Sequence, residues 1–385
     1  MTCSFGEFEL DPDRRELRRR GRPLSLQPQV LALLLYLAER RERAVGKEEL
    51  LEALCPGVAV TTGSLQRAVS LARASLGPEG REWIRTLPRF GYRFAAPVTA
   101  AGTDGPRLRP RYVRRGAVHV AYHVLGTGPP DILVVLGWAF PMAAALELPE
   151  MERQCRALAR LGRLVLFDKR GTGMSDRVER LPGLEERMED VEGVLDAVGS
   201  ERALLVGVSE GGPLCLMLAA SRPRRVRGLL LAGAFARMAA APDYPWGWTP
   251  DAVERLRGYV RSSWGAGATF TAAAPSRRED PAFRAWAQRA ELLGASPGAA
   301  LALVDMNLAI DARALLPAVR VPTTILHRAG DPVVHPGHGR FLADSIPGAR
   351  HVERPGADHL FCFDDPDPLV EEAGRLLATP AGELS

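Results

Sequence analysis

Lysine is almost absent from this chain of 385 residues. Two of its 50 basic residues are lysines, Lys47 and Lys169, so arginine carries nearly all of the positive charge. The sequence also holds 38 glycines and 31 prolines. A GC-rich genome explains this composition as readily as function does, so the scarcity of lysine assigns no function by itself.

Cysteine is also scarce, and its five positions are scattered along the chain. They form no C-x-x-C pair and no other metal-ligand spacing, which argues against a disulfide framework and a cysteine-based metal site. We expect free thiols in a reducing compartment, with no metal and no cofactor.

Long apolar runs are missing as well. The longest, residues 30–38, is far short of the roughly 20 residues that a membrane helix needs. The first residues show no basic segment followed by an apolar one, as a signal peptide would. We therefore expect a soluble, cytoplasmic protein with no membrane contact.

Length and charge together predict two parts. A chain of 385 residues exceeds one ordinary hydrophobic core, so two domains are expected. Residues 1–117 hold 21 Lys+Arg against 13 Asp+Glu, a net charge of +8, which leaves −4 for the remainder. A basic front and a mildly acidic body indicate different partners.

The first hundred residues predict short strands, three helices and a closing hairpin. Helices are expected over 30–40, 47–54 and 62–76, and the hairpin strands over 83–86 and 92–94. The third helix has one apolar stripe at spacings of four, three and four. The stripe consists of Leu65, Val69, Ala72 and Leu76. The opposite face carries Gln66, Arg67, Ser70 and Arg73.

The hairpin contains the signature Ile-Arg-Thr-Leu-Pro-Arg-Phe-Gly-Tyr-Arg-Phe, residues 84–94. With the elements before it, this signature resembles the winged-helix DNA-binding domain of OmpR/ToxR-type response regulators, and we assign residues 1–98 to it. The resemblance implies that the third helix enters the major groove of double-stranded DNA and that the hairpin is a wing. It also implies tandem half-sites, and therefore a homodimer.

The candidate DNA-binding residues follow from side-chain chemistry. Arginine pairs with phosphates or guanine edges, and glutamine can reach an adenine. The candidates on the helix are Gln66, Arg67, Ser70 and Arg73, and those on the wing are Arg85, Arg89 and Arg93. The alternative is a solvated helix face in a domain that has become a protein-interaction module.

Residues 99–116 are rich in Ala, Gly, Pro and Arg and have no apolar period, which predicts a linker. Its arginines either follow the DNA backbone or are simply solvated. No acidic phosphoacceptor domain precedes the winged helix and no membrane helix follows it. We therefore expect control of DNA binding to come from the C-terminal part.

Over residues 117–380 strand and helix patterns alternate, which predicts an α/β fold with a mostly parallel sheet covered on both faces. One strand, 204–208, runs into Gly-Val-Ser-Glu-Gly at 207–211 and then into a helix. A G-x-S-x-G pattern on such a turn presents Ser209 as a nucleophile in a strained conformation. Gly207 and Gly211 let strand and helix approach. A tight turn without chemistry is the alternative.

Two later strand ends supply an acid and a histidine, Asp331 and His359. The order serine, acid, histidine and the loop Phe-Asp-Lys-Arg-Gly-Thr-Gly-Met-Ser-Asp at 167–176 resemble the α/β-hydrolase superfamily over about 112–378. The resemblance implies that His359 takes the proton of Ser209 while Asp331 orients the imidazole. Asp305 and Asp358 are alternative acids.

The implied oxyanion donors are the backbone N–H groups of Glu210 and Trp138. Leu136-Gly137 stands where related hydrolases usually have His-Gly, so this loop departs from the family pattern. Glu210 also places a carboxylate beside the nucleophile, which would either orient a polar substrate group or repel an oxyanion.

A helical cap is expected over about 236–315, with helices near 250–262, 281–293 and 297–307. Trp246 and Trp248 lie in this segment and, together with Trp138, are the candidate substrate-pocket residues. The alternative for each tryptophan singly is the core of the cap.

The sequence therefore predicts a DNA-binding transcription regulator whose α/β-hydrolase-like domain senses a small apolar or aromatic ligand, with or without hydrolysing it. The rival hypothesis is a serine hydrolase that cleaves an ester, lactone or amide and has an accessory DNA-binding domain.

Overall fold

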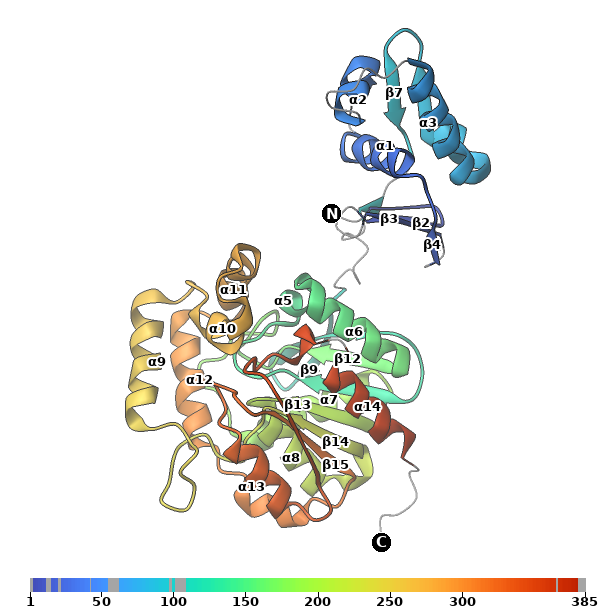
Figure 1. Cartoon of the computed structure of the whole chain (residues 1–385). Coiled ribbons are helices and arrows are strands. Elements are labelled where there is room, and N and C mark those ends of the chain that lie inside the picture. Colours follow the sequence, from blue (N-terminus) through green and yellow to red (C-terminus); the bar gives the residue numbers. More distant parts are fainter. Residues whose placement is uncertain are drawn as a thin grey trace. The chain divides into compact units, whose positions relative to one another are not determined.

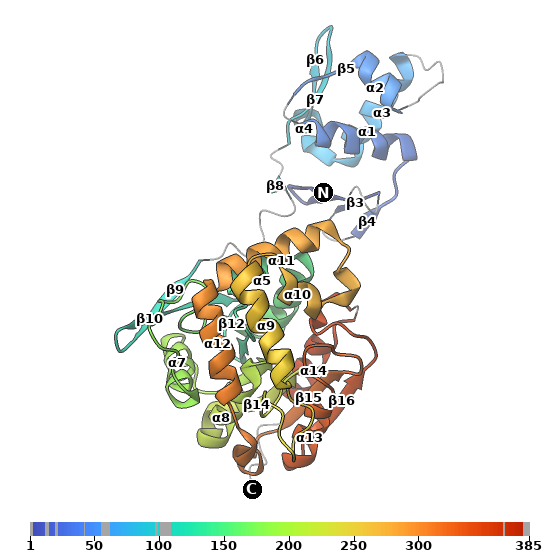
Figure 2. The same cartoon turned by 90° about the vertical axis from the view of Figure 1, so that its left-hand side faces the viewer.

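The computed structural model describes residues 3–11, 15–19, 22–41, 43–54, 62–96, 99–100, 109–364 and 366–379. The chain divides into two compact units, Met1–Arg107 and Leu108–Ser385, which are drawn in Figures 1 and 2. Each unit has its own hydrophobic core.

The first unit contains a small antiparallel sheet, four helices and a hairpin. The sheet has the order β4-β3-β2-β1-β8. Its strands are β1 (Cys3–Phe5), β2 (Phe8–Asp11), β3 (Glu16–Arg19), β4 (Arg22–Leu24) and β8 (Thr99–Ala100). The helices are α1 (Pro28–Glu39), α2 (Lys47–Leu54), α3 (Thr62–Ser75) and the single turn α4 (Gly80–Trp83). The second sheet consists of β5 (Val45–Gly46), β7 (Gly91–Phe94) and β6 (Ile84–Leu87).

The apolar stripe predicted on the third helix is buried. Its residues, which lie on α3 and just after its end, are at most 2% exposed and belong to one core cluster with α1. Three aromatic rings complete this core, with Phe5 meeting Trp83 and Phe94 edge to face at centroid distances of 5.5 and 5.1 Å. Because α3 buries its apolar face against α1, its polar face is left at the surface.

The second unit is built on an eight-stranded sheet of order β16-β15-β14-β13-β11-β12-β10-β9. The strands are β9 (Arg111–Arg115), β10 (Val118–Leu125), β11 (Asp131–Val135), β12 (Arg163–Phe167), β13 (Ala203–Val208), β14 (Val226–Ala232), β15 (Thr323–Arg328) and β16 (Arg350–Arg354). From β12 to β16 all neighbours pair in parallel, and β9 and β10 pair antiparallel.

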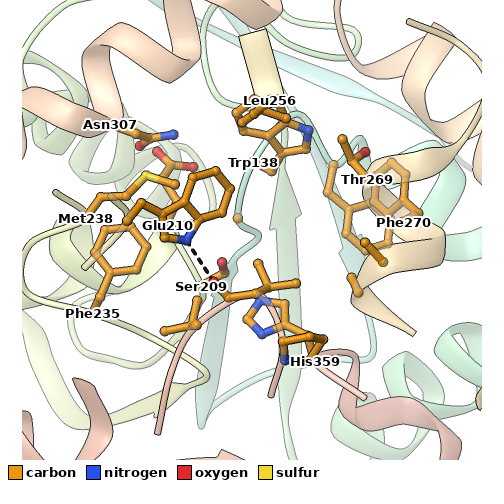
Figure 3. A pocket seen from close by; sticks show the side chains of 18 of the residues that line it. Trp138, Ser209, Glu210, Phe235, Met238, Leu256, Thr269, Phe270, Asn307 and His359 are labelled. Atoms are coloured by element: carbon orange, nitrogen blue, oxygen red, sulfur yellow. Dashed lines mark hydrogen bonds between the residues drawn. The ribbon is translucent and has the colours of Figure 1, made fainter. Parts of the chain in front are cut away.

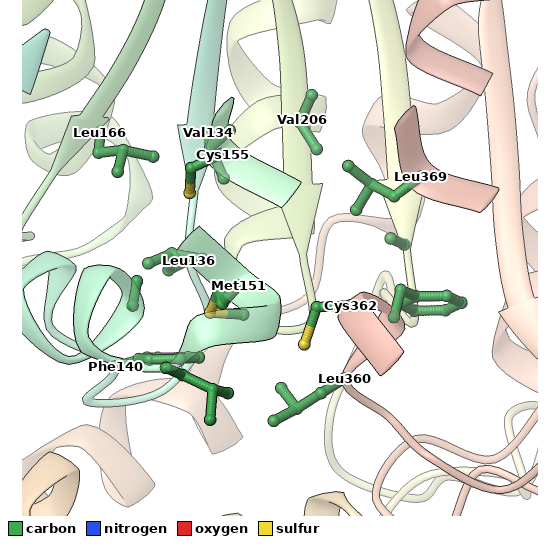
Figure 4. Close-up of a cluster of buried hydrophobic side chains, with 14 of the residues drawn as sticks. Val134, Leu136, Phe140, Met151, Cys155, Leu166, Val206, Leu360, Cys362 and Leu369 are labelled. Atoms are coloured by element: carbon green, nitrogen blue, oxygen red, sulfur yellow. The ribbon is translucent and has the colours of Figure 1, made fainter. Parts of the chain in front are cut away.

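Helices cover both faces of this sheet. Successive side chains of a buried strand point in opposite directions, so each central strand contributes to two core clusters. Ile132 and Val134 of β11 join one core cluster, to which α5 (Met142–Glu147), α6 (Pro149–Leu161) and α14 (Pro368–Ala378) contribute. Figure 4 shows part of this cluster. Leu133 and Val135 join the other cluster, with α7 (Leu184–Ala197), α8 (Gly211–Ser221) and α13 (Gly337–Ser345).

The expected extent of the linker, residues 99–116, is wrong at both ends, where the structure has strands. Thr99–Ala100 forms β8, which pairs with β1, and Arg111–Arg115 forms β9, which pairs with β10 at the edge of the large sheet. Arginines dominate β9 and only Val113 packs against the core. An edge strand with so little apolar surface has no readable period, so its composition looked like that of a tether. Residues 101–108 lie outside the described residues.

The cysteines whose side chains the structure describes are free and buried. They are Cys155, Cys215 and Cys362. Burial raises the pKa of the Cys155 thiol to about 12, so this group stays protonated and unreactive at neutral pH. The prediction of free thiols is confirmed for these three residues.

Four helices lie between β14 and β15: α9 (Pro250–Ser263), α10 (Ala268–Ala273), α11 (Pro281–Gly294) and α12 (Pro297–Ala309). The fully buried carboxylate of Glu291 on α11 organises the turn between α9 and α10. It accepts hydrogen bonds from the hydroxyls of Tyr259 and Thr269 and from the backbone N–H groups of Gly265, Gly267 and Thr269, at 2.7–2.9 Å. One side chain thereby fixes the start of α10.

No single helix among the described residues is long and apolar enough to span a membrane. By length and composition alone α11 and α12 would pass as a pair, across a bend of 82°.

Two glycines provide a matched test of how closely α8 packs. A Cβ at Gly211 would lie 2.1 Å from the carbonyl oxygen of Val135, whereas a Cβ at Gly258, inside α9, would meet nothing within 4 Å. We expect Gly211→Ala to lower the free energy of unfolding by about 1–3 kcal/mol through overpacking. Gly258→Ala should raise it by about 0.5–1 kcal/mol. Calorimetry of the full chain measures both, and equal effects would contradict the close approach of strand and helix.

Candidate active site and DNA-binding surface

Ser209 occupies the turn between β13 and α8. Its φ of +53° is in the left-handed region that residues other than glycine rarely adopt. Its N–H donates to Ala232 O of the neighbouring strand at 3.0 Å, and its carbonyl accepts from Gly212 N–H at 3.0 Å. Two hydrogen bonds thus stabilise the strained conformation that the G-x-S-x-G pattern predicts.

Asp331 and His359 lie on the loops after β15 and β16 and contact each other. His359 Nδ1 is 2.6 Å from Asp331 Oδ2, and the other oxygen of Asp331 accepts from the N–H groups of Val333 and Val334 at 2.8 and 2.9 Å. Burial by itself raises the pKa of Asp331, but His359 and these backbone donors outweigh it and hold the pKa below its usual value. The carboxylate is therefore charged at neutral pH and fixes the imidazole.

Ser209 and His359 line the same cavity, and both are labelled among its lining side chains in Figure 3. His359 Nε2, the ring nitrogen that faces away from Asp331, is buried and has no hydrogen-bond partner among the described residues. The structure therefore brings the three predicted residues together but does not close the hydrogen bond between serine and histidine. Such bonds are often long in free enzymes and tighten when substrate binds.

The carboxylates of the two alternative acids are engaged by other residues. Asp358 binds the backbone N–H and hydroxyl of Ser276, and Asp305 pairs with Arg257 at the surface. Of the other histidines, His338 also lines the cavity. It contacts the Tyr244 hydroxyl at 2.7 Å, and burial lowers its pKa to about 4, so it is neutral at pH 7.

The two segments expected to supply oxyanion donors are in contact. A Cβ at Gly137 would lie 2.6 Å from Ser209 Cβ and 3.1 Å from Glu210 N, so only glycine permits the approach of the loop after β11 to the nucleophile. Trp138 follows with φ of +49°, a second strained residue beside the first. The departure from a His-Gly pair leaves this close approach intact.

Glu210 is held by two cations that the sequence analysis did not identify. Its carboxylate is ion-paired to Lys169 and Arg187, and all three side chains are buried. Lys169 also donates to the carbonyl oxygen of Trp138 at 2.8 Å. Burial raises the pKa of Glu210, but Arg187 and Lys169 outweigh it and lower the pKa below its usual value. The carboxylate beside the nucleophile is thus compensated by two cations rather than presented to an oxyanion.

A cavity of about 370 Å³ opens above these residues and is lined mostly by apolar side chains. Trp138 and Trp248 line it, as expected, with Phe235, Met238 and Phe270. Trp246 does not. Its ring packs against Tyr244 and Phe341 at centroid distances of 5.3 and 5.9 Å.

The sequence analysis also missed a polar residue of this cavity. Asn307 of α12 is 1% exposed and lines the cavity, and neither of its amide atoms has a hydrogen-bond partner among the described residues. Trp138 Nε1 is likewise buried without a partner there. No sequence signal separates Asn307 from an ordinary polar position of a cap helix.

On the winged helix, the candidate DNA-binding residues fall into two groups. Gln66, Arg67 and Ser70 are exposed on one face of α3, and Arg85, Arg89 and Arg93 are exposed on the β6–β7 hairpin. Arg85 and Arg93 are direct cross-strand partners, and with Arg41 they line one hollow. Like charges placed opposite each other are unfavourable without an anion between them, which suits contact with phosphate.

Arg73 is engaged within the domain. Its Nε donates to Ile84 O at 3.0 Å and its guanidinium also donates to Thr86 Oγ1 at 2.8 Å. Arg73 thereby ties the hairpin to α3, and its contact with DNA stays a prediction.

Comparison with known proteins agrees with this geometry. Residues 150–366 match the family described as alpha/beta hydrolase fold, and residues 21–94 match the family described as transcriptional regulatory protein, C terminal. The first match covers more than half of the chain, so this protein belongs to the α/β-hydrolase fold family, and it carries a regulatory winged helix in front. The predicted fold class and both predicted resemblances are confirmed.

Individual relatives resemble one part or the other. A putative carbamate hydrolase, RutD, of Azorhizobium caulinodans is 29% identical over 268 residues, 68% of this chain and 95% of the relative. The transcriptional activator CadC of Escherichia coli K12 is 28% identical over 96 residues, 24% of this chain and 19% of CadC. The crystal structure of a bromoperoxidase from Bacillus anthracis has a TM-score of 0.63 at 22% identity, covering 70% of this chain and 100% of that one, and shows the fold alone. The chain therefore joins a DNA-binding regulatory domain to a hydrolase-fold domain that takes a small molecule.

The ion cluster around Glu210 yields a stability prediction. Glu210→Gln leaves Lys169 and Arg187 buried without a countercharge, and we expect the free energy of unfolding to fall by about 3–5 kcal/mol. As a control, Glu353→Gln removes the surface partner of Arg340 and should cost less than about 1 kcal/mol. Denaturant unfolding monitored by circular dichroism measures both, and a small loss for Glu210→Gln would mean that the cluster is not tightly coupled.

Proposed function

We propose that this protein is a transcription regulator whose hydrolase domain binds a small apolar or aromatic ligand above Ser209 and hydrolyses it at an ester or lactone bond. The observation that carries the proposal is the His359–Asp331 hydrogen bond beside a serine at φ +53°, at the base of an apolar cavity. A nucleophile, a base and an orienting acid in this arrangement are the parts that acyl transfer needs.

The chemistry would follow from the positions of these groups. Ser209 Oγ attacks the ligand carbonyl carbon, and its proton passes to His359 Nε2, while Asp331 stabilises the imidazolium. Backbone N–H groups of Glu210 and Trp138 donate to the oxyanion. The C–O bond then breaks, and His359 returns the proton to the leaving alcohol. Water repeats the sequence on the acyl-enzyme, which releases the acid and restores Ser209.

Regulation would arise if the ligand prefers one arrangement of the protein over another. A ligand shifts a conformational equilibrium only by the difference between its affinities for the two states. The winged helix, by its resemblance, reads tandem half-sites, so we propose a homodimer on DNA in the cytoplasm. Ligand would then act on the spacing or pairing of the two copies.

A second function is favoured by one observation, the 29% identity with the putative carbamate hydrolase across nearly the whole hydrolase domain. In that alternative the domain is a working hydrolase of an ester, lactone or amide, and DNA binding is accessory. The two functions differ in whether ligand changes DNA affinity.

Replacement of the nucleophile tests the catalytic half of the proposal. We expect Ser209→Ala to lower kcat for p-nitrophenyl butyrate by about 10³-fold or more, since the covalent route is lost. Ser262→Ala, an exposed serine of α9 that bonds its own helix at Gly258 O, should leave kcat unchanged. Release of p-nitrophenol measures both. Equal rates for Ser209→Ala and the parent chain would rule out Ser209 as nucleophile.

Substitution of Arg67 tests the DNA half. We expect Arg67→Ala to weaken binding of the protein to double-stranded DNA from upstream of the protein's own gene. If Arg67 contacts a phosphate, the slope of log K against log salt concentration should also decrease in magnitude by about 1. Arg340→Ala, a surface arginine of α13 in the hydrolase domain, serves as the control for a lost positive charge. Fluorescence anisotropy across a salt series measures both. Unchanged affinity for Arg67→Ala, or equal losses for the two variants, would contradict the role of α3.

A further inference from the structure

An unpartnered polar side chain faces the cavity above Ser209. Asn307 is 1% exposed, and both its Oδ1 and its Nδ2 lack a hydrogen-bond partner among the described residues. Leaving a buried amide unpaired is costly, and buried polar groups in folded proteins nearly always have a partner. An amide held in this state inside a cavity is suited to a ligand that supplies the missing bonds.

The surroundings of Asn307 leave it available. Figure 3 shows it on the same wall of the cavity as Met238 and Glu210, across from Thr269 and Phe270. Glu210, a charged group on that wall, has both oxygens engaged by Lys169 and Arg187. The remaining lining is mostly apolar, and the charged residue Arg255, which also lines the cavity, makes no hydrogen bond to the Asn307 amide. Both amide atoms are therefore open to a ligand.

We propose that Asn307 selects ligands that present an N–H donor and a carbonyl acceptor on one edge, as a primary carboxamide or a lactam does. Asn307 Nδ2 donates to the ligand carbonyl, and Oδ1 accepts from the ligand N–H, so that two parallel bonds form. A ketone of the same shape makes only the first of these bonds. The role of Asn307 rests on the proposed function and narrows its substrate class. The substrate would be an apolar ester or lactone that also bears such an amide.

The specificity test compares esters that differ in one group. p-Nitrophenyl esters of straight-chain acids ending in a primary carboxamide are paired, at each chain length, with esters ending in the isosteric methyl ketone. We expect the carboxamide ester of the best length to have a kcat/KM about ten- to hundredfold higher, the effect of leaving a polar partner unpaired. Asn307→Leu should abolish this ratio, whereas Met238→Leu on the same wall should retain it.

Binding without turnover keeps this proposal separate from the catalytic one. Hexanamide and 2-heptanone differ only by NH₂ against CH₃, and the fluorescence of the cavity tryptophans Trp138 and Trp248 reports their binding. Tighter binding of hexanamide to the parent chain, lost in Asn307→Leu, supports the proposal even if no ester is hydrolysed. Equal affinity for the two ligands overturns it and means that water satisfies Asn307.

Folding of the variant distinguishes specificity from structure. Because the side-chain amide of Asn307 makes no hydrogen bond to the described chain, we expect Asn307→Leu and Asn307→Ala to melt within a few degrees of the parent chain. A large fall in Tm for both variants would show that Asn307 supports the cap rather than the ligand, and would also overturn the proposal.

Discussion

The buried ion cluster of Glu210, Lys169 and Arg187 is the interaction on which the site depends. Glu210 directly follows Ser209, and Lys169 reaches both the Glu210 carboxylate and the carbonyl oxygen of Trp138. One ammonium group therefore links the nucleophile turn to the loop after β11. A buried carboxylate at this position would be unfavourable alone, and it is tolerated because two cations are buried with it. Among the described residues of this domain, Ser209 and Trp138 are the two non-glycine residues with positive φ, and they lie on the two segments that this cluster joins.

Ser209, Asp331 and His359 could be singled out from the sequence because each one is marked locally. Ser209, Asp331 and His359 all follow strands that are apolar or otherwise regular, and parallel strands deliver their carboxyl ends to one edge of a sheet. Contacts between distant segments were not predictable in this way. Arg187 belongs to α7, a helix with many charged residues, and no pattern shows that its guanidinium is buried against Glu210.

Two further contacts between distant segments were not predictable from the sequence pattern. Arg73 was assigned to DNA because its helix face is polar, but its hydrogen bond to the Ile84 carbonyl depends on how α3 packs against the hairpin. Trp246 was assigned to the cavity with Trp248, but its ring packs against Phe341, whereas Trp248 Nε1 donates to Val333 O. Periodicity predicts which face of an element is buried, and it does not predict which side chain meets which. Asn307 was not identified from the sequence for the same reason, since its environment is created by residues from several elements.

The carboxylate of Glu291 has a consequence for affinity. Five hydrogen bonds converge on it and define the turn that leads into α10, whose Phe270 forms part of the cavity wall. A wall held by such bonds is already ordered before a ligand binds, so binding does not include the entropic cost of ordering that segment. The strength of ligand binding would then derive from desolvation and from fit to a wall that is already formed.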